Sequence, residues 1–340
     1  MAIDYERRLQ NLKARRFDNE LNESVLTKSF DSTSIPKDIK YLMESMVMID
    51  RKYNDRTLEA AKRVQNHLEA GLELHFSRAY RTQGSVMTST NIKVHSDFDL
   101  LTIIDRYHFT GHGVPNDNPY TESDPNEDIK ELRKQSTSIM ENKYDEVDKG
   151  GKKSISIYNK ALRRKVDIVF CFWQNSKEYE DTKNEYYRGI YLFDFKENEK
   201  ILDYPFAHIN QVNSKGDSTN DGSRKGIRLL KTLKADSDEE IALSSFHLTT
   251  IVHSIDNSDI YYTPGNEIKI AKTISNQLQK LITDSGYRQS VKSPNGTENP
   301  LTENTVQGMK KIKADLDELI SDVHKELYLG YFEKGELIYS

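Results

Sequence analysis

Hydrophobic positions recur at the spacing of an α-helix in the first part of the chain. Between Lys37 and Leu74 they fall three or four residues apart, which predicts one long helix or two nearly continuous ones. The first thirty residues also have a helical pattern, which ends near Ser32-Thr33-Ser34, and Pro36 stands where the next helix would begin. The sequence therefore predicts a long N-terminal helix that packs against the remainder of the chain.

Short apolar runs follow and predict strands. Residues 74–80 lead into Gly84-Ser85, and Phe98 to Asp105 is nearly continuously apolar, as in a strand buried on both faces. The Gly-, Pro- and Asn-rich stretch 108–127 predicts an exposed loop. A helical pattern comes next, and the remaining strands are expected after it; the ranges are 129–144 for the helix and 154–158, 165–173, 189–194 and 201–204 for the strands.

The pattern changes after Pro205. The polar stretch 211–223, which contains Gly216 and Gly222, predicts a loop. Helical patterns follow at 224–234, 239–255, 267–283 and 304–327. The chain is thus α+β first and mostly helical afterwards. This predicts two domains, a core at 1–205 that includes the N-terminal helices and a helical lobe at 206–340.

Composition narrows the class of protein. The chain has 340 residues, more than one ordinary core accommodates, which agrees with two lobes. Its net charge of −5 gives no overall basic field for nucleic acid. A single cysteine, Cys171, excludes a disulfide framework and a Cys-based zinc module. No apolar run approaches membrane-spanning length, so we expect a cytoplasmic protein without a membrane partner.

Three aspartates carry the candidate chemistry. Asp97 and Asp99 flank Phe98, and residues two apart on a strand point to the same face, so both carboxylates project together while Phe98 enters the core. Asp167 lies in the apolar run Val166 to Phe170, where a charge is costly unless it is paired or bound to metal. Adjacent carboxylates are typical ligands of Mg²⁺. The pattern predicts a two-cation site of Mg²⁺ or Mn²⁺.

A glycine-serine turn precedes the carboxylates. Gly84 would let the backbone approach phosphate oxygens, Ser85 would donate to them, and Gln83 flanks the turn as a further substrate contact. A turn of this kind beside a two-cation site is suited to holding a nucleoside triphosphate. The combination predicts nucleotidyl transfer.

The order of these residues resembles a known superfamily. Gly-Ser, a spacer, Asp-x-Asp and a later strand aspartate resemble the polymerase-β-type nucleotidyltransferases. The segments IRLLKTLK at 227–234 and LSSFH at 243–247 resemble the helical lobe of cyclic GMP-AMP synthase and its bacterial relatives, the CD-NTases of anti-phage signalling. This resemblance implies a polymerase-β-like core with a mixed β-sheet, a C-terminal helical lobe and a long N-terminal spine helix.

The resemblance also implies a reaction and residue roles. The activity would be synthesis of a cyclic di- or trinucleotide second messenger from ATP, GTP or pyrimidine NTPs. Asp97 and Asp99 would bind both cations and Asp167 the catalytic one. In the helical lobe, one lysine and one serine would contact phosphate and an aromatic ring would stack on the donor base; these are Lys231, Ser245 and Phe246.

One departure from the animal enzyme concerns activation. That enzyme carries a His/Cys zinc insertion used with DNA, which a chain with one cysteine cannot supply. We therefore expect no DNA requirement. The last residues, KGELIYS, fit either a free tail or a segment that engages a regulatory protein.

Two other functions fit the same residues. One is another nucleotidyl transfer, onto RNA, a protein or a small molecule, which would need an added acceptor. The other is a nucleotide-binding sensor without turnover, against which the complete set of three aspartates argues, since a pure binder needs no two-cation site.

Overall fold

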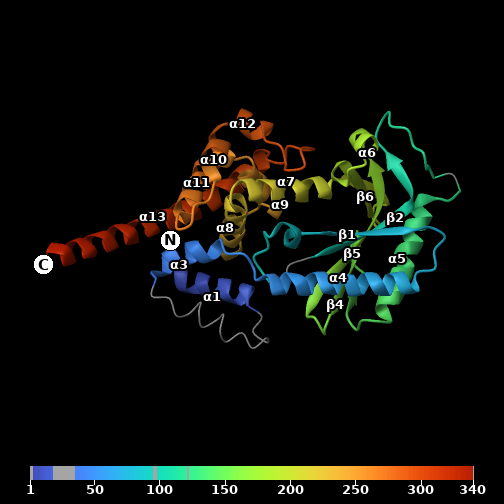
Figure 1. Ribbon diagram of the computed structural model, residues 1–340, viewed down its shortest axis with the longest axis horizontal. Coiled ribbons are helices and arrows are strands. Elements are labelled where there is room, and N and C mark those ends of the chain that lie inside the picture. The colour runs from blue at the N-terminus through green and yellow to red at the C-terminus, as the bar shows by residue number, and fades with distance from the viewer. Residues whose placement is uncertain (1–2, 18–34, 95–97, 121, 340) are drawn as a thin grey trace. The chain divides into compact units, whose positions relative to one another are not determined.

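The structure is a computed structural model that describes residues 3–17, 35–94, 98–120 and 122–339, with side chains as far as Tyr328 (Figure 1). The helices are α1 (Tyr5–Arg16), α3 (Lys37–Ser45), α4 (Arg51–Gly71), α5 (Pro125–Glu141), α6 (Lys177–Thr182), α7 (Pro205–Ser218), α8 (Gly222–Asp236), α9 (Ser245–His253), α10 (Asn257–Ile260), α11 (Glu267–Thr283), α12 (Ser285–Ser290) and α13 (Glu303–Tyr339). The strands are β1 (Arg78–Gln83), β2 (Asp99–Thr110), β3 (Val147–Asp148), β4 (Ser154–Asn159), β5 (Arg164–Asn175), β6 (Arg188–Asp194) and β7 (Glu199–Asp203).

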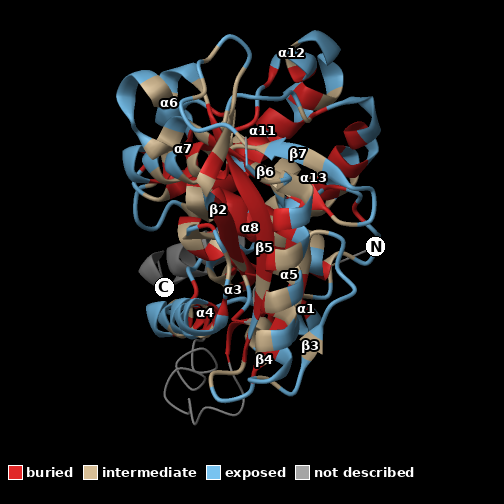
Figure 2. Ribbon diagram, turned by 90° about the vertical axis from the view of Figure 1, so that its right-hand side faces the viewer, coloured by how far each residue is buried: buried red, intermediate tan, exposed pale blue. Residues whose placement is uncertain are grey.

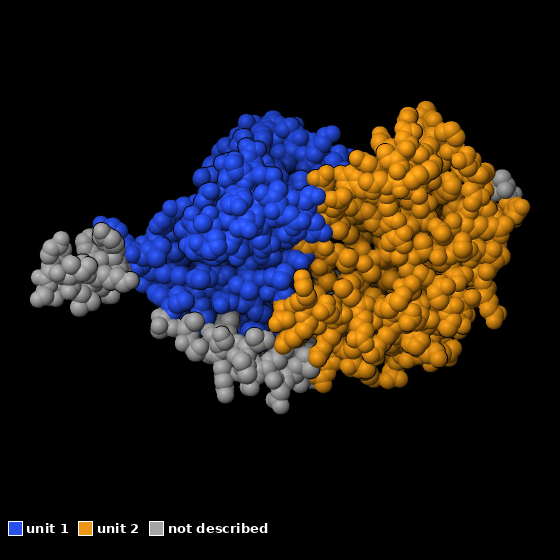
Figure 3. Space-filling model, in the orientation of Figure 1, with its two compact units in different colours: residues 1–49, 89–94, 212–340 blue, residues 50–88, 95–211 orange. Residues whose placement is uncertain are grey.

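The chain divides into two compact units (Figure 3). The sheet unit comprises residues 50–88 and 95–211, and the helical unit comprises residues 1–49, 89–94 and 212–340. This grouping differs from the expected division after residue 205. The N-terminal helices α1 and α3 belong with the C-terminal helices because Leu12 and Tyr41 pack in the same core as residues of α8 and α13.

A mixed sheet forms the centre of the sheet unit. Within the described residues it has seven strands, in the order β1-β2-β5-β4-β3, with β6 paired to β5 and β7 to β6. The pair β2–β5 is parallel and the other pairs are antiparallel. Strand β5 has β2 along one edge, while β4 and then β6 pair with successive halves of its other edge. This central position accounts for its nearly continuous apolar sequence.

The two faces of the sheet carry different cores. On β5, Ile168 and Phe170 point to the face that also packs residues of α4 and α5, whereas Val169 and Cys171 point to the opposite face. Figure 2 shows the buried residues gathered along β2 and β5. Phe98 is fully buried in the first of these cores, as the alternation of Asp97 and Asp99 around it predicted.

Helix α4 is the long helix expected near the N-terminus. Asp50 caps its N-terminus: the Asp50 carboxylate accepts a hydrogen bond from the backbone N–H of Lys52 at 3.0 Å, a favourable cap for a helix start. Its apolar stripe, which includes Val64 and Leu68, packs into the core of the sheet unit. Of the two expected alternatives, one helix or two, the structure shows two, α3 and α4.

A buried arginine, Arg228, connects separate segments of the helical unit. Arg228 of α8 donates to the carbonyl oxygen of Met46 at 2.7 Å and to that of Ser89 at 2.6 Å. It also forms a 2.6 Å ion pair with the carboxylate of Asp221. These bonds connect α8 to the end of α3 and to the segment 89–94, because a fully buried guanidinium needs its donors satisfied.

The predicted loop at 211–223 is wrong, because α7 continues to Ser218 and α8 begins at Gly222. The two glycines serve close packing rather than helix breaking. A Cβ on Gly216 would lie 2.2 Å from the Arg224 guanidinium carbon, and one on Gly222 would lie 1.9 Å from the carbonyl oxygen of Ile260. From the sequence alone, a glycine can mark either a loop or a close helix contact, because the residue against which it packs is not known.

Several other boundaries differ from the sequence prediction. The helix expected at 239–255 begins only at Ser245, because Ser244 caps it in a capping box with His247. Strand β1 begins at Arg78 rather than residue 74. Strand β2 runs on to Thr110, into the expected loop, where it keeps pairing with β5. The strands expected near 154, 165, 189 and 201 are confirmed as β4, β5, β6 and β7.

Two predicted features lie outside the described residues. These are Asp97 and the end of the first helical stretch near Ser32. Among the residues that the structure does describe, no helix has the length and apolar character needed to cross a membrane.

Candidate active site

Four residues form a row across neighbouring strands of the sheet unit. Gln83 of β1 pairs with Asp99 of β2, Asp99 pairs with Asp167 of β5, and Asp167 pairs with Ser156 of β4. The backbone N–H of Asp167 also donates to the carbonyl oxygen of Phe98 at 2.9 Å, which fixes this register. Neighbouring strands lie about 4.8 Å apart, so the two carboxylates project side by side from the same face.

Two side chains hold the Asp167 carboxylate. The Ser156 hydroxyl donates to Oδ1. The Lys165 ammonium lies 3.3 Å from Oδ1 and 3.4 Å from Oδ2. Lys165 is not among the site residues expected from the sequence. The signal that could have placed it is its spacing of two from Asp167, which puts both side chains on one face.

The glycine-serine turn adjoins this row. Gly84 follows Gln83 directly and has a φ of 120°, a backbone conformation open to glycine and rare for other residues. A single 3₁₀ turn, Ser85–Thr88, begins after it and is closed by the N–H of Met87 donating to the Gly84 carbonyl at 3.1 Å. Because Gln83 pairs with Asp99, the turn starts one residue from the carboxylate row. The sheet thus brings the predicted phosphate turn together with Asp99 and Asp167.

The donor set of this row is chemically suited to a divalent cation. Asp99 and Asp167 offer carboxylate oxygens, the ligands that Mg²⁺ prefers. Beside them, Oε1 of Gln83 is buried without a hydrogen-bond partner among the described residues, so the row has unused acceptor capacity. Within those residues no cluster of three His, Cys, Asp or Glu side chains forms; the third predicted ligand is Asp97, which lies outside them.

The other predicted site residues belong to the helical unit. The Lys231 ammonium on α8 donates to the Thr90 carbonyl oxygen at 3.1 Å and contacts the Thr90 hydroxyl at 3.4 Å. Burial, and then the charge of Arg228, lower the pKa of Lys231 to about 8. Ser245 is the first, exposed residue of α9, and the half-buried Phe246 follows it. Their predicted roles stay predictions.

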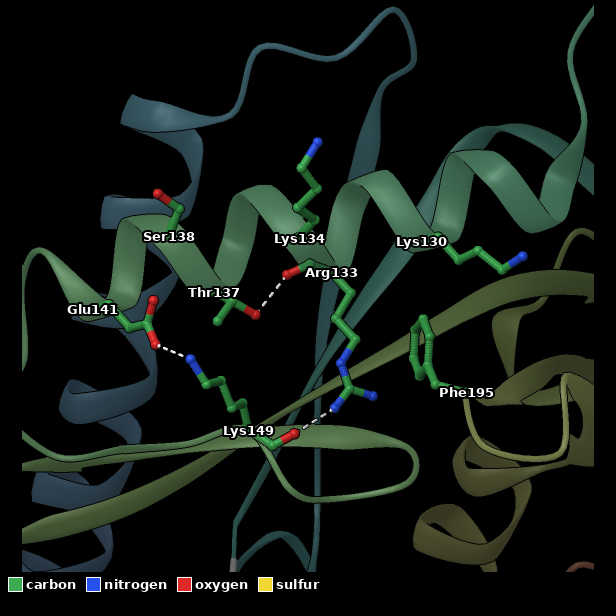
Figure 4. A pocket seen from close by; sticks show the side chains of 8 residues that line it. All are labelled: Lys130, Arg133, Lys134, Thr137, Ser138, Glu141, Lys149 and Phe195. Atoms are coloured by element: carbon green, nitrogen blue, oxygen red, sulfur yellow. Dashed lines mark hydrogen bonds and ion pairs between the residues drawn. The ribbon is translucent and has the colours of Figure 1, made fainter.

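A hollow elsewhere in the sheet unit is structural in character (Figure 4). Its cavity of about 490 Å³ is lined from α5 and the β3–β4 connection, on the opposite face from the carboxylate row. Arg133 lies over the ring of Phe195 at 4.3 Å and donates to the carbonyl oxygens of Lys149 and Gly151. Burial lowers the pKa of this guanidinium. Arg133 therefore ties the β3–β4 connection to α5.

This fold and this row of side chains define a class of enzyme, the polymerase-β-like nucleotidyltransferases. A solved structure with a similar fold is the STING-associated CdnE c-di-GMP synthase from Capnocytophaga granulosa, which is 28% identical, has a TM-score of 0.80, and matches 95% of this chain and 100% of its own. No family model matches the chain.

Two curated relatives narrow the class to a family. The cyclic dinucleotide synthase CdnE of Yersinia aleksiciae is 33% identical over 267 residues, which cover 76% of this chain and 69% of that one. The c-di-GMP synthase of Lachnospiraceae bacterium (strain RUG226) is 34% identical over 293 residues, covering 77% and 82%. The chain belongs to the bacterial cyclic GMP-AMP synthase-like nucleotidyltransferases, which synthesise cyclic oligonucleotides from nucleoside triphosphates and generally need a divalent metal ion.

Proposed function

We propose that this chain is a cyclic dinucleotide synthase that makes c-di-GMP from two molecules of GTP. The observation that carries the proposal is its 34% identity to a relative named c-di-GMP synthase, along 82% of that relative. The C. granulosa enzyme of similar fold is also named a c-di-GMP synthase and is described as STING-associated. By analogy, a STING-type receptor would read the product in an anti-phage response.

The carboxylate row would hold the cations. Asp99 and Asp167, together with Asp97, would ligate Mg²⁺ or Mn²⁺. Bound there, such cations lower the pKa of an attacking hydroxyl and neutralise charge that develops on the transferring phosphate. The support for this role is the in-register pairing of Asp99 with Asp167 on one sheet face.

The turn at Gly84 would receive the donor triphosphate. Gly84 leaves the backbone open to phosphate oxygens, and Ser85 brings a hydroxyl and an N–H to the same place. Gln83, whose buried Oε1 has no hydrogen-bond partner within the described ranges, would face a donor group of the substrate. In the helical unit, Lys231 and Ser245 keep their predicted phosphate contacts and Phe246 its predicted stacking on a base.

The reaction is two successive displacements at phosphorus. A ribose hydroxyl of one GTP attacks the α-phosphorus of the other, the new P–O bond forms in line, and the bond to the β-phosphate breaks to release pyrophosphate. The hydroxyl proton passes to the Asp167 carboxylate and then to solvent. A second displacement closes the ring, so two GTP give one c-di-GMP and two pyrophosphates.

The test is a product assay with purified protein. The protein is incubated with GTP alone, with each other NTP, and with all four, in Mg²⁺ or Mn²⁺, and then treated with phosphatase. Mass spectrometry of the surviving species should show c-di-GMP from GTP alone, and none from an Asp97→Asn variant. A resistant product that requires a second NTP would replace c-di-GMP with a mixed dinucleotide. A product that appears only with added RNA or protein acceptor would overturn cyclic synthesis.

A further inference from the structure

The catalytic carboxylate Asp167 is neutralised by a side chain of its own strand. Lys165 lies two residues earlier on β5, and its ammonium contacts both oxygens of Asp167, at 3.3 and 3.4 Å. The Ser156 hydroxyl holds Oδ1 from the neighbouring strand. A divalent cation at this carboxylate needs the same oxygens, and its charge repels an ammonium at this distance.

Exposure shows which of the two partners can move. The Lys165 side chain is 49% exposed, whereas the Asp167 side chain is 17% exposed. An exposed lysine has a flexible stem and a strongly hydrated head, so it can leave one carboxylate for another nearby. Asp167 is instead fixed by its strand and by Ser156. The ammonium is therefore the partner that cation binding would displace.

A receiving site for the ammonium adjoins Lys165. Lys165 itself lines a cavity of about 520 Å³, together with Ser156, Tyr158 and three acidic residues of the β3 region, Asp145, Glu146 and Asp148. Asp148 pairs with Ser156 across β3 and β4, so it continues the row that contains Asp167. Asp145 and Glu146 already pair with Lys160, at 2.9 and 3.7 Å, so Asp148 is the carboxylate of this pocket to which the ammonium would move.

We propose that Lys165 is a counter-ion switch for the catalytic carboxylate. In the cation-free enzyme its ammonium neutralises Asp167; when a divalent cation binds, the ammonium moves to the acidic pocket that contains Asp148. Lys165 thereby sets the cation concentration at which the carboxylate row fills. The inference rests on the proposed function in taking Asp167 as a cation ligand, and it makes Lys165 a positioning residue.

The test measures cation binding without nucleotide. Mn²⁺ is titrated into the full chain and followed by electron paramagnetic resonance and calorimetry, so that no turnover is needed. Lys165→Gln should tighten the Mn²⁺ Kd by about 3- to 10-fold, since no ammonium has to be displaced. Lys152→Gln is the matched control, because this exposed lysine pairs with Glu197 at 3.7 Å and belongs to the same region of the sheet unit; its Kd should stay unchanged.

A double-mutant cycle identifies the receiving site. Asp148→Asn should weaken Mn²⁺ binding when Lys165 is present and have no effect in the Lys165→Gln background, a coupling that a general change of charge does not produce. Any one of three results would overturn the switch. These are equal Kd values for wild type and Lys165→Gln, an equal tightening of the Kd in the Lys152→Gln control, and no coupling between Lys165 and Asp148.

One further variant tests the proposed cation site independently of the Lys165 switch. Asp167→Asn should lose Mn²⁺ binding if the carboxylate row is the cation site. If Asp167→Asn loses Mn²⁺ binding while Lys165→Gln keeps the wild-type Kd, the switch is refuted and the cation site stands. Unchanged binding in Asp167→Asn refutes the cation site itself and the switch with it. Circular dichroism of each variant confirms that the fold is retained.

Discussion

Asp99 on β2 and Asp167 on β5 stand directly opposite each other in a parallel strand pair, with their side chains on the same face of the sheet. Two carboxylates separated by one strand spacing repel each other unless positive charge lies between or beside them. In this structure the Lys165 ammonium provides that charge to Asp167. Under the proposed function the pair would hold a cation, so removing either member should affect catalysis much more than folding.

Asp99→Asn and Asp167→Asn should each lower kcat for cyclic product by at least about 100-fold, because cation binding contributes several kcal/mol and each 1.36 kcal/mol is tenfold in rate. The amide is isosteric, so thermal unfolding should change little. Asp181→Asn, which alters an exposed carboxylate of the same sheet unit that pairs with Lys177, is the control and should retain activity. Activity within a few-fold of wild type in Asp167→Asn would contradict the site.

The pH dependence of substrate binding should report Lys231. Burial and Arg228 lower its pKa to about 8, so the ammonium is present below pH 8 and is lost as the pH rises through that value. The KM for nucleotide should therefore rise above pH 8, with the protonated fraction falling about tenfold per pH unit. Lys231→Arg should keep KM flat to pH 9.5, because arginine stays charged. A wild-type KM that stays flat across this range would exclude the contact.

The free energy of unfolding should rise with pH through the same residue, whereas nucleotide binding should weaken. The pKa of Lys231 is lower in the folded chain than in the unfolded one, so between about pH 8 and the ordinary lysine value the unfolded chain binds more protons. This group alone therefore makes unfolding less favourable as the pH rises through that window. The free energy of unfolding in urea is measured for wild type and Lys231→Met at pH 7.5 and pH 9.5. The change with pH in the difference between the two proteins is the contribution of Lys231.

Replacement of Arg228 should destabilise the helical unit. Arg228→Met would leave the Asp221 carboxylate and the carbonyls of Met46 and Ser89 without their partner. Because the Asp221 side chain is 39% exposed, the main cost is the loss of the donor to the two carbonyl oxygens, about 1–3 kcal/mol for a buried acceptor left unsatisfied. Denaturant unfolding measures the loss. Arg7→Met, which removes an exposed pair with Asp238, should change unfolding far less, and an equal effect of both variants would refute this role for Arg228.

Gly222 should tolerate no side chain. A Cβ there would lie 1.9 Å from the Ile260 carbonyl oxygen, and backbone cannot retreat as a flexible side chain can, so Gly222→Ala should cost at least the ~1–3 kcal/mol of an overpacked core. Gly286→Ala is the matched control, since its nearest neighbour would be the Asp284 carboxylate at an ordinary 3.5 Å. The comparison is of melting temperatures, and equal values for the two variants would show that the helical unit relaxes around Gly222.

Some parts of the site could be predicted from residue spacing alone. The alternation of Asp97, Phe98 and Asp99 predicts one buried ring between two carboxylates on a common face, and the structure confirms Phe98 in the core. Such periodicity is local, because a strand's side chains alternate whatever lies around it. For the same reason the strands and most helices were predicted in type, while their ends were not.

Contacts between distant segments could not be predicted in this way. Gly216 and Gly222 looked like loop residues because their partners, Arg224 and Ile260, are found only when helices pack. A glycine flanked by Asn or Ser occurs both in loops and at close contacts between helices, so this local pattern does not distinguish the two. Likewise, the helix at 239–255 was expected too early because Ser244 caps α9 only in the folded unit.

The order and spacing of residues indicate the class of chemistry: which residues carry charge, which face of a strand they share, and the order Gly-Ser, Asp-x-Asp, Asp along the chain. The packed fold adds that β2 and β5 are neighbours in a register that sets Asp99 beside Asp167, and that Lys165 and Ser156 hold the Asp167 carboxylate. The physical reason is that alternation and helical period are properties of the backbone over a few residues. Strand register and helix contacts depend instead on burying apolar surface contributed by segments far apart in the chain.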